Sequence, residues 1–377
     1  MTQFTFNTTP SIQFGAGNLD RVAEFSACCG DTILIVTDAG MVATGIVERA
    51  VQKLQTAGKA VTVFDGVEAD PIEEIVLRAA KVAATHSGVI GLGGGSSLDV
   101  AKLAALLAGN AQPLKKAYGV GNATGPRLPL VLIPTTAGTG SEVTPISIVT
   151  TGANEKMGVV SPIILPDVAI LDPELTYGLP PHVTAATGID AMVHAIEAYA
   201  SASPNNNPIS RALAVRALDL MGPALERAVH DGDTSARSDM LLGSMLAGQA
   251  FANSPVAAVH ALAYPLGGHY HIPHGLSNAL VLPHVLRFNA VEASGPYENL
   301  ARHLFPDRHD MSAMDFADAL AALSQRCGLQ QRLADFDISA DKLPMLAKDA
   351  AKQTRLLVNN PRTVSEADAL AIYRAAL

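Results

Sequence analysis

The sequence predicts a protein of two domains, an N-terminal α/β domain built on a parallel sheet and an all-helical C-terminal domain. Three observations lead to this prediction. A chain of 377 residues is long for a single core. Its first half alternates Val/Ile-rich runs with Ala/Leu-rich stretches, and after Pro180-Pro181 it becomes rich in Ala, Leu and Met with few β-branched runs. We therefore expect domains at 1–180 and 181–377.

Four short apolar runs in the first half predict buried strands. Helical stretches at 45–58 and 71–86 separate some of them, and further β-like runs lie at 146–151 and 168–171. Apolar strands that alternate with helices are typical of a parallel sheet covered on both faces. The strand runs are 32–37, 60–64, 88–92 and 130–133, and the helices expected in the second half are 182–201, 208–230 and 235–253.

Composition excludes several classes of protein. The formal net charge is -9 and no basic run is present, which disfavours nucleic-acid binding. No apolar run reaches membrane-spanning length, and the N-terminal segment lacks the basic and apolar regions of an export signal. Cys28, Cys29 and Cys327 form neither a disulfide framework nor a thiolate zinc site. We therefore expect a cytoplasmic protein without nucleic-acid or membrane partners.

A glycine-rich loop follows the strand run 88–92. Gly93, Gly94, Gly95 and Ser96 lead into a helix expected at 98–107. Glycines let the backbone approach a ligand closely, and the free N–H groups at a helix N-terminus suit a pyrophosphate. The spacing is G-x-G-x-x-S rather than the dinucleotide fingerprint G-x-G-x-x-G. By itself the loop therefore indicates a tight turn and a phosphate site equally well.

Two neighbouring features favour a dinucleotide. The run 130–133 ends in a loop where four of the seven residues from Thr135 to Ser141 carry hydroxyls, and ligands of open α/β sheets bind at such strand ends. Asp38 follows the run 32–37, where its carboxylate would accept hydrogen bonds from a ribose diol and repel the extra phosphate of NADP. An N-cap or turn role is the plainer interpretation of Asp38. If Asp38 does bind ribose, the preferred cofactor is NAD.

One carboxylate and three imidazoles predict a metal site. Asp190 and His194 lie at i and i+4 of an expected helix, among apolar neighbours. Four of the 11 histidines fall between His260 and His274. We expect Pro265 and the glycine pair after it to end the helix that carries His260, and His274 to open the next element. If these four side chains converge, they suit Fe²⁺ or Zn²⁺.

Together these motifs resemble the iron-containing (group III) alcohol dehydrogenase family. The resemblance runs from Ile12 to Arg362, and its most specific parts are GGGSSLDVAK at 93–102, PTTAGTGSE at 134–142, GIDAMVHAIEAY at 188–199 and PHG at 273–275. It implies a dehydroquinate synthase-like fold. In that fold a Rossmann-like, dinucleotide-binding α/β domain and an all-helical domain flank the active site. It also implies a homodimer.

The resemblance assigns roles to particular residues. It implies that the metal ligands are Asp190, His194, His260 and His274. The contacts that it implies for NAD lie at the strand ends and on the two loops. They are Asp38, Gly93, Gly94, Gly95, Ser96, Asp99, Thr135, Thr136, Thr139 and Lys156.

Two positions depart from the family pattern. Tyr264 stands where many members have a histidine four residues after the third ligand, and Asp70-Pro71 stands where Asn-Pro is frequent. The family's histidine is often credited with a role near the reacting proton. Three proton routes therefore stay open in this chain: Tyr264 itself, His271 (with His269 the weaker choice), or water and ribose hydroxyls alone.

The predicted activity is hydride transfer between a small primary alcohol and NAD, with Fe²⁺ or Zn²⁺ polarising the substrate oxygen. One alternative is a maleylacetate-reductase-like enzyme that reduces an oxo-acid. Asp190 counts against it, because such members tend to lack that ligand. The other alternative is a non-catalytic nucleotide- or metal-binding protein. It would leave the cofactor loop and the four ligands together unexplained.

Overall fold

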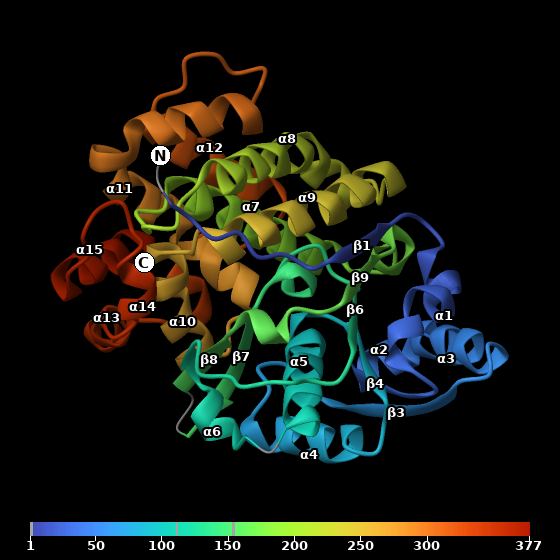
Figure 1. Cartoon of the computed structure of the whole chain (residues 1–377). Helices are drawn as coiled ribbons and strands as arrows, with labels where there is room; N and C mark the ends of the chain where they lie inside the picture. Colours follow the sequence, from blue (N-terminus) through green and yellow to red (C-terminus); the bar gives the residue numbers. More distant parts are fainter. Residues whose placement is uncertain (1–2, 111, 153–154) are drawn as a thin grey trace. The chain divides into compact units, whose positions relative to one another are not determined.

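The computed structural model describes residues 3–110, 112–152 and 155–377 (Figure 1). Residues 1–2, part of the segment examined for an export signal, lie outside the described residues, as do 111 and 153–154 of the predicted domain 1–180. By its internal contacts the chain divides into two compact units. We call Asn7–Gly178 the α/β unit, and Leu179–Leu377 with residues 3–6 the helical unit.

A six-stranded parallel sheet is the centre of the α/β unit. Its order is β1-β9-β6-β4-β2-β3, and every neighbouring pair is parallel. The four predicted strand runs all form strands, each extended by one to three residues at its carboxyl end. The strands are β1 (Ser11–Phe14), β2 (Thr32–Asp38), β3 (Ala60–Val67), β4 (Gly88–Gly93), β6 (Leu130–Pro134) and β9 (Val168–Leu171).

Helices cover both faces of this sheet, as the apolar strands predict. Leu34 and Val36 of β2 share one buried cluster with residues of α4 and α5, whereas Ile33 and Ile35 share the opposite cluster with residues of α1 and α3. Alternate side chains of one strand therefore serve two cores. The helices of this unit are α1 (Val22–Phe25), α2 (Ala39–Ala43), α3 (Ile46–Thr56), α4 (Glu73–Ala83), α5 (Gly95–Gly109) and α6 (Leu114–Ala117).

The strands that follow β2 in the sequence are added to the sheet on opposite sides of it. β3 lies on one side of β2 and β4 lies on the other, and the following helices α3 and α5 cover opposite faces. In open parallel sheets ligands bind outside the carboxyl ends of the two strands at such a switch point. Here those ends are Asp38 and Gly93.

A second, three-stranded sheet stands beside the parallel one. β7 (Ile146–Thr151) occupies the predicted run 146–151 and pairs antiparallel with β8 (Glu155–Val160). β8 in turn pairs parallel with β5 (Gly119–Val120). The β-like run 146–151 is therefore a strand as predicted, in a sheet that the sequence did not predict.

The helical unit contains no strand among the described residues. The three helices predicted here match α7, α8 and α9 to within one residue, and α7 packs against α8, α9 and α11. None of the described helices is both long and apolar enough to cross a membrane. The helices are α7 (Pro181–Ala200), α8 (Pro208–His230), α9 (Thr234–Asn253), α10 (Ala258–Tyr270), α11 (His274–Leu304), α12 (Ala313–Arg326), α13 (Leu343–Ala351), α14 (Thr354–Leu357) and α15 (Glu366–Ala376).

The end of α10 corrects one prediction. The helix does not stop at Pro265 and the glycine pair but continues to Tyr270, and it ends where His271 adopts a left-handed φ of 55°. A proline inside a helix costs about 3 kcal/mol. Packing offsets this cost, because Leu262 and Leu266 are buried and α10 packs against α11 and α13. His274 opens the next helix, as predicted.

Candidate metal centre and cofactor loop

α7 carries the first two predicted metal ligands on one face. The helix begins at Pro181, and its first turn tolerates proline because the missing N–H has no helical partner there. Asp190 and His194 follow one turn apart, and they are only 1% and 4% exposed. A buried carboxylate requires compensating partners. The structure supplies them from two other helices.

The remaining two imidazoles lie at the starts of α10 and α11. His260 is in the first turn of α10, and His274 is the first residue of α11. Gly275 allows α11 to begin close to α7, because a Cβ at this position would collide with the backbone carbonyl of Ala186. The glycine of the PHG motif thus has a steric reason, since a larger residue would move His274 away from Asp190.

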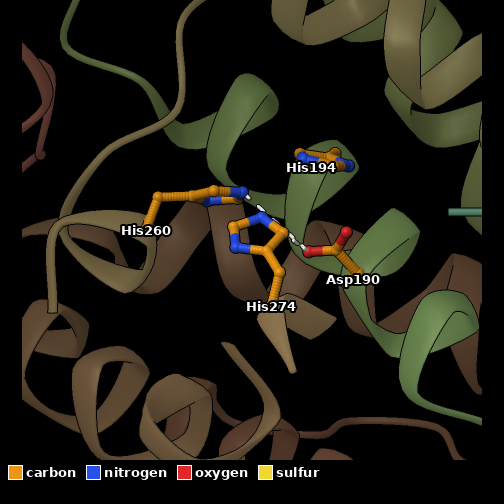
Figure 2. A group of neighbouring side chains, drawn as sticks. All are labelled: Asp190, His194, His260 and His274. Carbon is orange, nitrogen blue, oxygen red and sulfur yellow. Dashed lines mark ion pairs between the residues drawn. The ribbon is translucent and has the colours of Figure 1, made fainter. Parts of the chain in front are cut away.

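The four predicted ligands converge in space (Figure 2). Asp190, His194, His260 and His274 each offer one ligand atom, and all four atoms lie within 4.8 Å of one another. The Asp190 Oδ1 atom lies 3.6 Å from His274 Nε2 and 4.0 Å from His260 Nε2. One carboxylate oxygen and three imidazole nitrogens form a donor set that fits a divalent ion such as Fe²⁺ or Zn²⁺. His274 is the exposed member of the set.

Electrostatics favour the charged form of the Asp190 carboxyl group. Burial by itself raises its pKa, but the positive charge of the three imidazoles and a hydrogen bond from Asn278 act in the opposite direction. The net result is a pKa below the usual value for aspartate. Asp190 is therefore held as an anion, which is the form that binds a cation.

Glu197 fixes the ring of His260. One carboxylate oxygen accepts a hydrogen bond from His260 Nδ1 at 2.7 Å, and the other accepts from the Val259 N–H at 2.7 Å. With Nδ1 engaged, His260 presents Nε2 to Asp190. Carboxylates behind histidine ligands commonly fix ring orientation in this way.

Asn278 also belongs to this cluster. It follows His274 by one helical turn, is fully buried, and donates from Nδ2 to Asp190 Oδ1 at 2.5 Å. Neither Asn278 nor Glu197 was among the predicted site residues. The available signal was spacing, because Glu197 lies three residues after His194 and Asn278 four after His274, on the same helix faces.

Aromatic side chains border the metal cluster. Phe251 of α9 stacks on His194 with ring centroids 4.3 Å apart, and Tyr264 of α10 lies with its ring 6.1 Å from that of His274. Tyr264, one of the two predicted proton carriers, is thus beside the cluster. His271, the other, is an exposed residue at the end of α10.

The predicted phosphate loop lies at the switch point of the parallel sheet. α5 starts at Gly95, earlier than the predicted 98, so the last loop glycine belongs to its first turn and no side chain caps it. Its first N–H groups remain available to a ligand. Gly93 adopts a φ of 150°, and a Cβ there would lie 2.9 Å from the Ser97 side chain and 3.4 Å from Asp38 Oδ2. A side chain at this position would fill the space between the two strand ends.

Asp38 is the N-cap of α2 and also lies beside the glycine loop. Its Oδ1 accepts from the Met41 N–H at 2.9 Å and so caps α2. Its Oδ2 accepts from the Ser97 hydroxyl at 3.3 Å. The interpretation as an N-cap is therefore correct, and it is compatible with a contact to ribose.

A buried lysine, Lys102, donates hydrogen bonds to the hydroxyl-rich loop and to the start of β7. Lys102 Nζ donates to the Ser141 hydroxyl at 2.8 Å and to the Ile146 carbonyl at 2.6 Å. Burial lowers the pKa of Lys102 to about 8. Burial also raises the pKa of Glu142, the residue after Ser141, to about 7. Asp99 accepts from Ser141 at 2.7 Å, so part of this predicted cofactor contact is engaged in shaping the loop.

The other predicted cofactor contacts lie in this unit too. Thr135 is buried, and Thr136 and Thr139 are partly exposed. Lys156 of β8 pairs with Asp70 at 2.5 Å and donates to the Thr150 hydroxyl at 3.0 Å. The position that departs from the family's Asn-Pro pattern is therefore the direct partner of Lys156.

Comparison with known proteins identifies the family. The profile described as iron-containing alcohol dehydrogenase matches residues 9–173, and that of the Fe-containing alcohol dehydrogenase family, C-terminal, matches residues 184–377. Long-chain-alcohol dehydrogenase 1 of Geobacillus thermodenitrificans is 42% identical over 97% of this chain and 95% of its own length.

Solved structures agree with the profiles. A 1,3-propanediol oxidoreductase superposes with a TM-score of 0.94 at 35% identity and covers 100% of both chains. Sulfoacetaldehyde reductase from Bifidobacterium kashiwanohense, solved with NAD⁺, gives a TM-score of 0.89 at 30% identity over 100% of this chain and 99% of its own.

These matches define an oxidoreductase. The chain belongs to the iron-containing alcohol dehydrogenase family. The predicted family, the predicted fold class and the predicted interconversion of alcohol and aldehyde are thereby confirmed. The predicted cofactors, NAD and iron, agree with the family description and with the NAD⁺ complex of a relative.

Proposed function

We propose that this enzyme interconverts a small primary alcohol and its aldehyde with NAD(H), using one divalent ion held by Asp190, His194, His260 and His274. The observation that carries the proposal is the convergence of these four side chains from three helices. Iron is the ion that the family description supports, and the donor set also suits zinc. NAD is supported by the glycine loop at the switch point and by the NAD⁺ complex of a relative.

We further propose how the two parts of the chain divide the work. Residues 1–180 form the NAD-binding domain and residues 181–377 the metal-binding domain. The proposed NAD contacts are the α5 N-terminus, the hydroxyl loop and the strand ends, with residues Asp38, Gly93, Gly94, Gly95, Ser96, Asp99, Thr135, Thr136, Thr139 and Lys156. Support comes from the carboxyl ends of β2, β4 and β6, where Asp38, the glycine loop and the hydroxyl loop follow one another in space, and Lys156 lies apart from these ends on β8 of the second sheet.

The chemistry divides between the bound groups and the side chains. A divalent ion supplies Lewis acidity toward the alcohol oxygen, which lowers the barrier to losing its proton. The protein orients the nicotinamide and excludes water. Tyr264, whose ring lies beside His274, and His271 are the proposed carriers of the proton that leaves the hydroxyl.

Location and assembly belong to the same proposal. A reduced compartment, the cytoplasm, suits three cysteines that are all free. A homodimer is the assembly that the family resemblance suggests.

The test is an activity panel with metal analysis. Purified protein is analysed for bound metals and assayed for NADH oxidation with straight-chain aldehydes of increasing length, 3-hydroxypropanal and sulfoacetaldehyde. We expect one ion per chain and turnover of at least one aldehyde. Turnover of an unsaturated oxo-acid in place of every aldehyde would favour the maleylacetate-reductase-like alternative. Metal binding without any turnover would favour a non-catalytic protein.

A further inference from the structure

Two adjacent cysteines of the α/β unit lie outside the metal cluster and outside the proposed NAD contacts. Cys28 and Cys29 belong to the short 3-10 helix Ala27–Cys29. Cys28 is exposed and Cys29 is fully buried, and both are free thiols. The pair therefore offers one thiol to a reagent in solvent and keeps a second thiol next to it.

The exposed thiol is the more acidic of the two. A hydrogen bond with the Cys29 thiol lowers the pKa of Cys28 to about 7, and the same contact raises the pKa of Cys29. Arg127 and Asp167 act on Cys28 in opposite directions and pair with each other at 2.7 Å. A substantial share of Cys28 is therefore thiolate near neutral pH, and the thiolate is the form that oxidants attack.

Cys29 is held in place against the start of β4. Its Sγ lies 3.8 Å from the carbonyl oxygen of Val89, and its own carbonyl accepts from the Ser87 hydroxyl at 2.7 Å. A Cβ at Gly88 would collide with Cys29, so strand and cysteine are closely packed. The buried thiol is thus fixed beside Cys28, where it can react with an oxidised Cys28 sulfur.

We propose that Cys28 and Cys29 form a reversible oxidation site, in which a peroxide oxidises the exposed thiol and the buried thiol converts the product into a vicinal disulfide. Exposed, reactive cysteines next to a second cysteine are typical of redox-sensing sites. The inference does not depend on the proposed function, because neither cysteine belongs to the metal cluster or to the NAD contacts.

The reaction has two steps. With hydrogen peroxide, the Cys28 thiolate attacks one oxygen and the O–O bond breaks, so that Cys28 becomes a sulfenic acid and the other oxygen leaves as water. The Cys29 sulfur then attacks the Cys28 sulfur, the S–S bond forms, and the sulfenic oxygen leaves as a second water with the Cys29 proton. Two thiols are oxidised and one peroxide is reduced to two waters.

The spacing of the pair makes the disulfide easy to reduce. Neighbouring Cα atoms across a trans peptide lie about 3.8 Å apart, whereas most disulfides join Cα atoms about 4.4–6.8 Å apart. A disulfide between adjacent residues is therefore strained, and strained disulfides are the labile, regulatory ones. Such a bond suits a reducing compartment, where protein disulfides are transient.

The test is hydrogen peroxide treatment of the full-length protein, followed by peptide mass spectrometry. Zinc replaces iron in the preparation, because zinc has no redox chemistry that would generate radicals from the peroxide. Dimedone is added to trap sulfenic acids. The wild type is compared with Cys28→Ser, Cys29→Ala and the control Cys327→Ser. Cys327 is buried, and burial raises its pKa to about 12.

In the wild type we expect loss of two of the three thiols, a peptide with Cys28 and Cys29 that is lighter by two hydrogen atoms, and full recovery after dithiothreitol. Cys28→Ser should keep both of its thiols, and Cys29→Ala should accumulate a dimedone adduct at Cys28. Cys327→Ser should form the same disulfide as the wild type.

Three results would overturn the inference. One is a wild type that keeps all three thiols, and another is a disulfide that joins two chains. The third is a dimedone adduct at Cys28 as abundant in the wild type as in Cys29→Ala, because Cys29 would then not react with the oxidised sulfur. If Cys29→Ala does not fold, the wild type and Cys28→Ser decide the question, since Cys28 is exposed and its replacement leaves the core intact.

Discussion

The carboxylate of Glu197 accepts a hydrogen bond from Nδ1 of His260 at 2.7 Å, although 63 residues separate them in the sequence. The same carboxylate accepts from the N–H of Val259, so it fixes both the ring and the backbone that carries it. With Nδ1 engaged by Glu197, Nε2 is the ring nitrogen of His260 that faces Asp190, at 4.0 Å from Oδ1.

Replacing Glu197 by Gln should weaken metal binding. The two donors reach different oxygens of Glu197, and in glutamine one of these oxygens becomes an NH2 group, so either the His260 ring or the Val259 N–H loses its acceptor. We expect Kd for Zn²⁺ to weaken about 10- to 100-fold, measured by chelator competition. Glu226→Gln, which breaks a surface pair with Arg326, is the control and should bind normally. Equal affinities in the two variants would show that Glu197 does not support His260.

His274→Ala should lose the ion. Removing one of four ligands leaves three donors, and the proposed role of His274 predicts loss of the metal and of activity together. Elemental analysis of the purified variant measures this directly. His269→Ala is the matched control, because His269 pairs with Asp349 at 2.7 Å and is not in the ligand set. Full occupancy in His274→Ala would remove this residue from the site.

Asp38→Asn should narrow the preference for NAD over NADP. Asn caps helices as well as Asp does, so the variant removes the charge while keeping the cap on α2. Loss of the repulsion toward a 2′-phosphate should raise kcat/KM with NADP about tenfold relative to that with NAD, which corresponds to about 1.4 kcal/mol.

Asp38→Gly, which also removes the cap, should change the cofactor preference in the same direction. It should lower stability by only a few tenths of a kcal/mol, because glycine is itself a tolerated N-cap. A wild type that already prefers NADP would contradict the role given to Asp38.

The pH profile of kcat/KM should identify the proton carrier. If Tyr264 carries the proton, Tyr264→Phe loses an ionisation near neutrality and much of its rate while it keeps its metal. If His271 carries it, His271→Ala shows that change instead. Two variants with the wild-type profile would leave the route to water and ribose hydroxyls, and neither residue would then be catalytic.

Glu142 should make stability depend on pH in a defined window. Burial raises its pKa from 4.5 to about 7, so between these values the folded protein binds more protons than the unfolded chain. The contribution of Glu142 to stability is therefore complete below pH 4.5 and is lost as the pH rises to about 7. We expect the Tm difference between the wild type and Glu142→Gln to change across this window and to be constant above it. A difference that is flat from pH 4.5 to 7 would contradict the raised pKa.

Local patterns predicted most of the fold because they reflect burial directly. The runs 32–37 and 130–133 are apolar on both faces, and the structure places both in a sheet with helices on each side. Pro265 shows where local rules fail. Proline disfavours a helix interior, but the buried residues of α10 outweigh that preference through contacts with helices that are distant in the sequence.

The candidate site was predictable only in part, for a similar reason. Asp190 and His194 share one helix turn, so their pairing is visible in the sequence. Glu197 and Asn278 are equally close to the ligands in space, but single polar residues on a helix do not reveal which distant groups they will meet. Their roles depend on how α7, α10 and α11 pack.

The spread of the ligand set along the chain constrains when the protein can acquire its ion during synthesis. Asp190 and His194 leave the ribosome well before His260, and the set is complete only after His274 and the start of α11 have emerged. By then the whole of Asn7–Gly178 has been made. Capture of the proposed ion by all four side chains is therefore a late event in synthesis.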